Sequence, residues 1–156
     1  MSRFLDIQVS LFDIGDFMSF KEKATWLYLA IAVVVPAAYF GWLLSEWSST
    51  PAEEIAFVRP MIIAVIASIV LNIVLTIPIA AVKPSEVDKT DEREIAIERH
   101  GEQIGVVILG TGAALVMGLL WFDVDHVWST NLLYLSFVTH AIVASTIKLI
   151  KFRKGL

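Results

Sequence analysis

The sequence predicts an all-α fold: a polytopic membrane protein built as a four-transmembrane-helix antiparallel bundle, with an N-terminal amphipathic interfacial helix. Two observations predict this fold. Of the 156 residues, 57% are hydrophobic, and the mean hydropathy is +0.74, whereas soluble domains are about half apolar and about one quarter charged. The charged residues are also unevenly placed, because they leave uncharged stretches of about 20 residues, the length that crosses a bilayer as a helix.

Residues 1–22 are predicted to form an amphipathic leader. Apolar residues recur there every three or four positions, as on one face of a helix: Phe4, Ile7, Leu11, Ile14 and Met18. Arg3, Asp6, Ser10 and Asp13 fall on the other side. We expect this helix to lie in the membrane interface. Because its polar face is acidic, attraction to anionic lipid does not explain its binding, and the leader is equally suited to docking a protein.

Four uncharged stretches are predicted to be transmembrane helices: residues 24–45, 61–82, 103–122 and 127–147. Each has the length of about 20 residues that crosses a hydrocarbon layer about 30 Å thick. The first span follows an acidic segment and has no cleavage motif after it, so we expect a retained signal anchor. Residues 83–102 are a charged loop and a helical extension of the third span, and residues 1–156 form a single membrane domain.

The positions of lysine and arginine predict the orientation of the spans. Of 12 such residues, three precede the first span, four lie between the second and third spans, and four follow the fourth. By the positive-inside rule, both termini and the 83–102 connection face the cytoplasm. Trp42, Trp47, Trp121 and Trp128 fall at the opposite surface, where an aromatic belt is expected.

Three features meet at similar depth within the predicted spans, namely His140, Asn72 and the helix-interrupting Pro36. The helical rise of about 1.5 Å per residue places all three close to the midplane. Two interpretations are open. The polar pair forms a proton relay or a solute-binding site, since ionisable residues inside membranes usually serve function. Alternatively, His140 is a neutral structural residue satisfied by Asn72, by the Ala32 carbonyl that Pro36 frees, or by Ser136.

Small residues follow the third span and its extension. They are predicted to form a packing face, because transmembrane helices associate through small side chains that let backbones approach. The face comprises Gly101, Gly105, Gly110, Ala114 and Gly118. It packs either within its own bundle or against another chain.

The extension of the third span carries a predicted partner-binding stripe, consisting of Asp91, Glu92, Arg93, Glu94, Glu98 and Glu102. Thr90 or Asp91 is a plausible N-cap for this helix. Like charges four residues apart destabilise a helix, so the glutamates require compensation. Arg93 and Arg99 within the helix, or the basic tail 151–154, supply it if the stripe is only a solvated face. Otherwise the stripe recognises a cytoplasmic protein.

The run Asp91-Glu92-Arg93-Glu94, followed by Ile97 and placed just before the third of four spans, resembles a family of small prokaryotic membrane proteins classed as a domain of unknown function. The likeness covers roughly residues 59–150. It implies a multi-pass protein of the bacterial or archaeal cytoplasmic (inner) membrane without enzymatic activity. It also implies, by analogy, a membrane-held regulatory role beside small helix-turn-helix regulators.

The sequence argues against catalysis and cofactor binding. It holds no cysteine, and it shows no nucleophile–base pattern, metal-ligand spacing or phosphate loop. His100 and His126 fall at opposite surfaces, so neither joins His140 on a haem. We therefore expect no enzyme activity, no cofactor and no metal.

Two functional hypotheses remain. The first is a non-enzymatic binding, accessory or regulatory subunit in the lipid bilayer, which docks a protein partner or another copy of the chain and does not bind nucleic acid directly. The alternative is an oligomeric channel or transporter for a small solute or ion, using His140 and Asn72.

Overall fold

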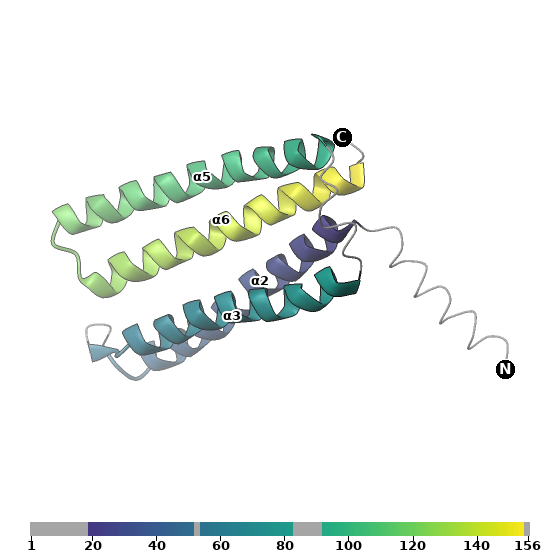
Figure 1. The fold of residues 1–156 in the computed structure, drawn as a ribbon. Coiled ribbons are helices and arrows are strands. Elements are labelled where there is room, and N and C mark those ends of the chain that lie inside the picture. Colours follow the sequence, from purple (N-terminus) through teal and green to yellow (C-terminus); the bar gives the residue numbers. More distant parts are fainter. Residues whose placement is uncertain (1–18, 52–53, 83–91, 155–156) are drawn as a thin grey trace, which may run out of the picture.

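The computed structural model describes residues 19–51, 54–82 and 92–154. In these residues the chain is all-helical, and four helices are long and apolar enough to cross a membrane. They are α2 (Phe20–Trp47), α3 (Val58–Val82), α5 (Glu92–Trp121) and α6 (His126–Lys154). Figure 1 shows them as an antiparallel bundle. The predicted all-α, four-helix fold is confirmed. Of the predicted leader over residues 1–22, residues 1–18 lie outside the described residues and residues 20–22 form the start of α2. Residues 83–91, which include Asp91, also lie outside the described residues.

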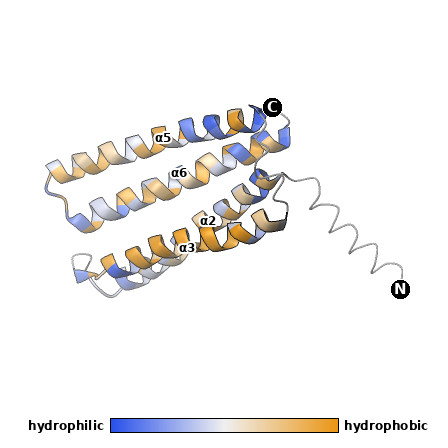
Figure 2. Cartoon of the chain, viewed as in Figure 1, coloured by the Kyte–Doolittle hydropathy of each residue, from blue (hydrophilic) through white to orange (hydrophobic). Residues whose placement is uncertain are grey.

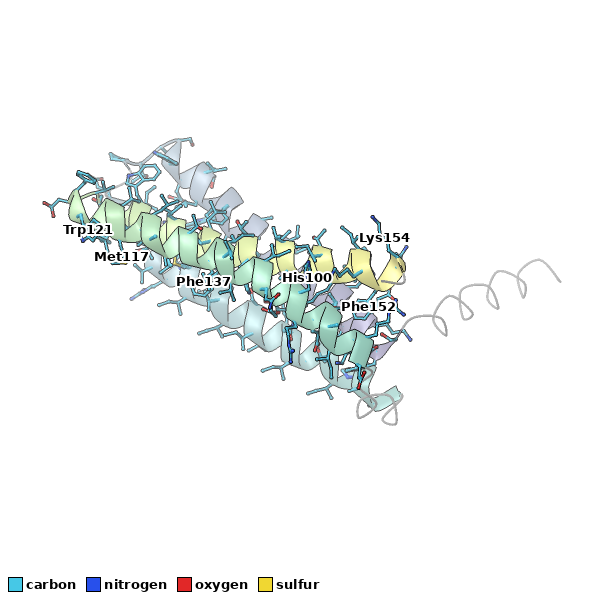
Figure 3. All side chains as sticks on the ribbon, turned by 90° about the horizontal axis from the view of Figure 1, so that it is seen from above. His100, Met117, Trp121, Phe137, Phe152 and Lys154 are labelled. Atoms are coloured by element: carbon cyan, nitrogen blue, oxygen red, sulfur yellow. The ribbon has the colours of Figure 1, made fainter. Side chains whose placement is uncertain are left out.

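The four helices run between the same two ends of the bundle, which we name by the residues found there. The charged end is where α2 and α5 begin and α3 and α6 end; the aromatic end carries Trp47, Trp121 and Trp128. Hydrophilic residues gather on α2, α5 and α6 at the charged end, while α3 is hydrophobic over most of its length (Figure 2). Trp121 and Lys154 lie at opposite ends of the bundle (Figure 3).

Local sequence explains where the helices begin and turn. The Ser19 side chain caps α2 by accepting a hydrogen bond from the backbone N–H of Glu22 at 3.3 Å. Between α5 and α6, Asp123 adopts a positive φ of 52°, a conformation that aspartate tolerates better than most residues. Asp125 then accepts a hydrogen bond from the Val127 N–H at 2.9 Å. This short turn makes α5 and α6 antiparallel neighbours.

The helices form two pairs of sequence neighbours, α2 with α3 and α5 with α6. A contact between α2 and α6 joins the two pairs. α3 is the most exposed helix, and its exposed residues are mainly isoleucine, valine and leucine. Such a helix suits lipid contact, because lipid chains solvate apolar side chains as well as a protein core does.

The apolar core lies toward the aromatic end, between α2, α3 and α6. Its buried members are Tyr39, Leu43, Ile55, Phe57, Met61, Ala64 and Val127. One polar pair crosses it: the Tyr39 hydroxyl donates to Asn131 Oδ1 at 2.7 Å, and the Asn131 amide donates to the Val127 carbonyl at 2.8 Å. Tyr39 and Asn131 are therefore buried with their hydrogen bonds made, as the low polarity of their surroundings requires.

The small-residue face differs from the prediction in its second half. Gly101 and Gly105 do contact α6, and the next contact is made by Gly112, whose missing Cβ leaves room for Ser136. Gly110 and Gly118 have nothing within 4 Å of where a Cβ would stand, and Ala114 is exposed. Gly110 follows Gly105 by five positions, so the two glycines face directions about 140° apart around the helix axis.

Candidate functional site

A polar cavity of about 400 Å³ opens among the four helices at the charged end. Its volume falls in the range of about 300–1,000 Å³ that is typical of small-molecule sites. The polar residues that line it come from every helix: Lys21, Thr25 and Tyr28 from α2, Asn72 and Thr76 from α3, Glu98 and Glu102 from α5, and His140, Ser145 and Lys148 from α6. We call it the polar cavity.

The carboxylate of Glu102 lies between two α6 side chains in the polar cavity. One oxygen, Oε1, accepts a hydrogen bond from Lys148 Nζ, and the other, Oε2, stands 3.7 Å from His140 Nε2. Lys148 and His140 are mostly buried, with side chains 16% and 18% exposed, whereas Glu102 is 51% exposed. The half-exposed carboxylate of Glu102 therefore contacts two side chains, Lys148 and His140, that are mostly buried.

Lys21 forms the second ionic group, at the mouth of the cavity. Its Nζ is 3.4 Å from Glu98 Oε2 and 3.9 Å from Glu94 Oε2. Three of the four glutamates of the α5 stripe, Glu94, Glu98 and Glu102, therefore face Lys21 or Lys148, which offsets their mutual repulsion. The compensating charges in these contacts come from Lys21 and Lys148. The sequence had suggested Arg93, Arg99 and the basic tail 151–154 instead.

The basic residues that the sequence suggested as compensation make other contacts. Arg153 pairs with Glu22 at 3.7 Å and lies 5.8 Å from the centre of the Trp26 ring. The Arg93 guanidinium approaches the Phe152 carbonyl at 3.5 Å. These contacts link the first turns of α2 and α5 to the last turn of α6.

His140 is held by packing on one side and by charge on the other. Its Nδ1 is buried and has no hydrogen-bond partner among the described residues, and the ring lies directly over Gly105. A neutral imidazole carries one N–H donor and one acceptor nitrogen. The arrangement favours the tautomer in which Nε2–H points to Glu102, because an unpaired buried donor at Nδ1 costs more than an unpaired lone pair.

The structure brings together some of the predicted site residues and separates others. Asn72 and His140 line the same cavity, while Pro36 lines a different, apolar one. Ser136, a predicted partner of His140, instead donates to the Leu132 carbonyl at 2.8 Å. The α5 stripe divides by its contacts: Glu94, Glu98 and Glu102 pair with lysines of α2 and α6, whereas Arg93 contacts the Phe152 carbonyl.

Sequence reasoning missed Lys21, Tyr28 and Lys148 as members of the site. For Lys148 a usable pattern exists: the short turn at 122–125 sets the register of the α5–α6 hairpin, so residues equally far from it lie opposite each other. Gly105 contacts Ala144 in this way, and Gly101 contacts Lys148. Glu102 and Lys148 could have been paired from this register. No comparable pattern places Lys21 or Tyr28, because α2 reaches the site through its crossing with α6.

The described residues contain no group of three or more histidine, cysteine, aspartate or glutamate side chains arranged to hold a metal ion. What the polar cavity offers is therefore charge, hydrogen bonding and a proton-accepting imidazole. It can bind a small polar or ionic group.

Comparison of the chain with protein-family models, with curated proteins and with solved structures gives no match. The resemblance to the small four-span family stays a prediction. The functional argument therefore rests on the geometry of the polar cavity.

Proposed function

We propose that this protein binds a small polar or ionic group in the polar cavity and belongs to the class of channels and transporters. The observation that carries the proposal is the carboxylate of Glu102, held between His140 and Lys148 in a cavity that all four helices line. His140 lies within the fourth predicted span, where an ionisable side chain is costly to keep and marks solute or proton pathways. Glu102 and Lys148 reach it from one residue beyond the third and fourth predicted spans.

The depth of the cavity supports this proposal. His140 follows Trp128 by 12 residues, or about 18 Å of helix. The cavity therefore extends from the charged end toward the middle of a hydrocarbon layer about 30 Å thick. It begins at Lys21, near the start of α2, and ends at Asn72 and His140. A solute that enters from the charged end would meet the lysine–glutamate pairs first and the uncharged side chains of Asn72 and Thr76 later.

The positive-inside rule gives the direction of entry. We propose that the charged end and both termini face the cytoplasm of a bacterial or archaeal cell, in its cytoplasmic membrane. The polar cavity then opens inward.

His140 lies at the deep end of the polar cavity, where its Nε2 stands 3.7 Å from Glu102 Oε2. Glu102 and Lys148 face it from α5 and α6, and Glu98, Lys21 and Tyr28 line the rest of the cavity. Lys148 contacts the other oxygen of Glu102, so one carboxylate holds both α6 side chains at once.

Thermal unfolding of the purified protein tests binding directly. The probes are acetate, tetramethylammonium and phosphocholine, which represent an anion, a cation and a zwitterion. A ligand present at about 100 times its Kd stabilises the folded state by about 2.7 kcal/mol. At least one probe should raise the Tm of wild type and of the control His126→Ala, whose side chain is exposed at the aromatic end. The increase should vanish in Glu102→Gln/Lys148→Met.

Flux into proteoliposomes separates transport from binding. With the bound probe supplied outside, wild type should give uptake, and His140→Ala should reduce it, because His140 contacts Glu102 at the deep end of the cavity. If no probe raises the Tm, or if the double variant keeps the increase, the proposal fails.

A second candidate is docking of a protein partner, as an accessory subunit, and one observation favours it. Glu92, Ile95 and Arg99 are exposed, and they follow one another at helical spacing on α5. Affinity purification from native membranes should compare wild type with Glu92→Lys/Arg99→Glu and with the control Lys154→Glu. A protein that is lost only from the α5 variant supports docking; an identical set of proteins from all three contradicts it.

A further inference from the structure

A second cavity of about 330 Å³ lies between α2, α3 and α6. Most of its lining is apolar, with Pro36, Phe137 and Ala32 among its residues. The space exists because small side chains stand where the helices approach each other: Ala32 on α2, Ser68 on α3 and Ala141 on α6. We call it the apolar cavity.

The two cavities adjoin. Tyr28 and Ala141 line both of them, one from α2 and one from α6. A third cavity, near the aromatic end, shares no residue with the polar cavity. The molecule thus presents one polar chamber at the charged end and, in the described part of the chain, one apolar chamber beside it.

The charges of the polar cavity select the kind of head group that fits. Lys21 and Lys148 are balanced there by Glu98 and Glu102. A ligand with a net charge can replace only one partner of such a pair, and it leaves the other partner uncompensated. A zwitterionic group replaces both kinds of contact at once, since its anion can take a lysine and its cation a glutamate.

The apolar cavity selects the rest of the ligand. The Ser68 hydroxyl, one of its few polar groups, is already bonded to the Ala64 carbonyl at 2.9 Å. The Tyr134 hydroxyl is buried without a partner in the described residues, so it is a lining group that a hydrocarbon segment would leave unpaired. The other lining residues are mainly apolar, and they favour an apolar segment of the ligand.

We infer that the ligand is a zwitterionic amphiphile, with its head group between Lys148 and Glu102 and a hydrocarbon chain in the apolar cavity. This inference rests on the proposed function, because it names the class of solute that the polar cavity binds. The two cavities meet at Tyr28 and Ala141, which line both of them.

The first experiment measures binding to protein in nanodiscs of two probes, lysophosphatidylcholine with a fluorescent chain and soluble phosphocholine. Ser68→Phe fills the apolar cavity from α3, the most exposed helix, and Ala114→Phe places the same bulk on the exposed side of α5 as a control. Lysophosphatidylcholine should bind wild type and Ala114→Phe at least tenfold more tightly than it binds Ser68→Phe or Glu102→Gln/Lys148→Met. Phosphocholine should bind Ser68→Phe as it binds wild type.

The outcomes separate the two proposals. If lysophosphatidylcholine binds no better than phosphocholine and Ser68→Phe has no effect, the inference fails while the proposed function stands. If neither probe depends on Glu102 and Lys148, both fail. If binding depends on Ser68 alone, the apolar cavity holds lipid chains without recognising a head group, and the inference is again wrong.

A measurement on wild type guards against misfolded variants. Lysophosphatidylcholine with a photoreactive group in its chain should crosslink mainly to residues of the apolar cavity, such as Val138 and Phe137, as mapped by mass spectrometry. An even distribution of crosslinks over the exposed apolar residues of α3 and α5 would overturn the inference.

Discussion

The imidazole of His140 lies against Gly105, so closely that a Cβ at Gly105 would stand 2.5 Å from Nδ1 of His140. The contact joins the α5–α6 packing to the polar cavity, because the same ring approaches the Glu102 carboxylate with its other nitrogen. The absence of a side chain at Gly105 therefore allows both the observed placement of the His140 ring and the close approach of α5 and α6.

Gly105→Ala should destabilise the protein and displace His140. Overpacking costs about 1–3 kcal/mol, which outweighs the gain of about 1 kcal/mol from replacing glycine by alanine in a helix. Gly110→Ala is the matched control, because nothing lies within 4 Å of its Cβ position. Thermal unfolding in detergent should show a lower Tm for Gly105→Ala and an equal or higher Tm for Gly110→Ala. Equal shifts in both variants would contradict the packing described for α5.

Tyr39→Phe should lower stability, whereas Tyr134→Phe should not. The Tyr39 hydroxyl donates to Asn131 at 2.7 Å, while the buried Tyr134 hydroxyl has no partner in the described residues. Interhelical hydrogen bonds in membrane proteins contribute about 0.6 kcal/mol on average and up to about 1.7 kcal/mol. The free energy of unfolding of the two variants, measured under identical conditions, should differ by an amount in this range. A larger loss of stability for Tyr134→Phe than for Tyr39→Phe would show that the Tyr134 hydroxyl, and not the Tyr39 hydroxyl, makes the stabilising hydrogen bond.

Exchanging the charges of Glu102 and Lys148 tests their pairing. Glu102→Lys and Lys148→Glu should each destabilise the protein, and the double exchange should recover part of the loss. Coupled neighbours typically interact by about 0.5–3 kcal/mol. Because Glu102 is half exposed, we expect a value near the lower limit. A double-mutant cycle measures it, and strictly additive losses would mean that the two side chains do not interact.

Cysteine labelling tests the proposed orientation. The chain has no native cysteine, so a single introduced thiol is labelled without background. Ser49→Cys, in the connection after α2, should react with a membrane-impermeant maleimide on intact cells. Lys154→Cys, at the end of α6, should react only after the membrane is permeabilised. The opposite pattern would place the polar cavity on the outer side.

Much of the fold could be predicted because transmembrane helices follow from composition and length. A backbone in hydrocarbon must satisfy its own hydrogen bonds, so an apolar stretch of about 20 residues has little choice but a helix. The predicted spans accordingly fall within α2, α3, α5 and α6, except that Phe122 lies one residue beyond α5. Two residues that line the polar cavity, His140 and Asn72, also stand out in the sequence as polar residues in apolar spans.

The partners of these residues could not be predicted in the same way. Glu94, Glu98 and Glu102 looked like a surface stripe because, on a single helix, nothing distinguishes a face turned to water from one turned to another helix. The break in the small-residue face is different, because the five-position step from Gly105 to Gly110 is visible in the sequence and already places Gly110 on another side of α5.

The sequence by itself determined that four helices form, how long they are and which ends carry charge, because these properties depend on local composition. Only the tertiary structure decided which side of each helix faces inward, that Lys21 and Lys148 meet the α5 glutamates, and that Asn72 and His140 share a cavity while Pro36 lines another. The reason is geometric: those contacts depend on how each helix is rotated and where it crosses its neighbours, and both are set by packing among residues far apart in the chain.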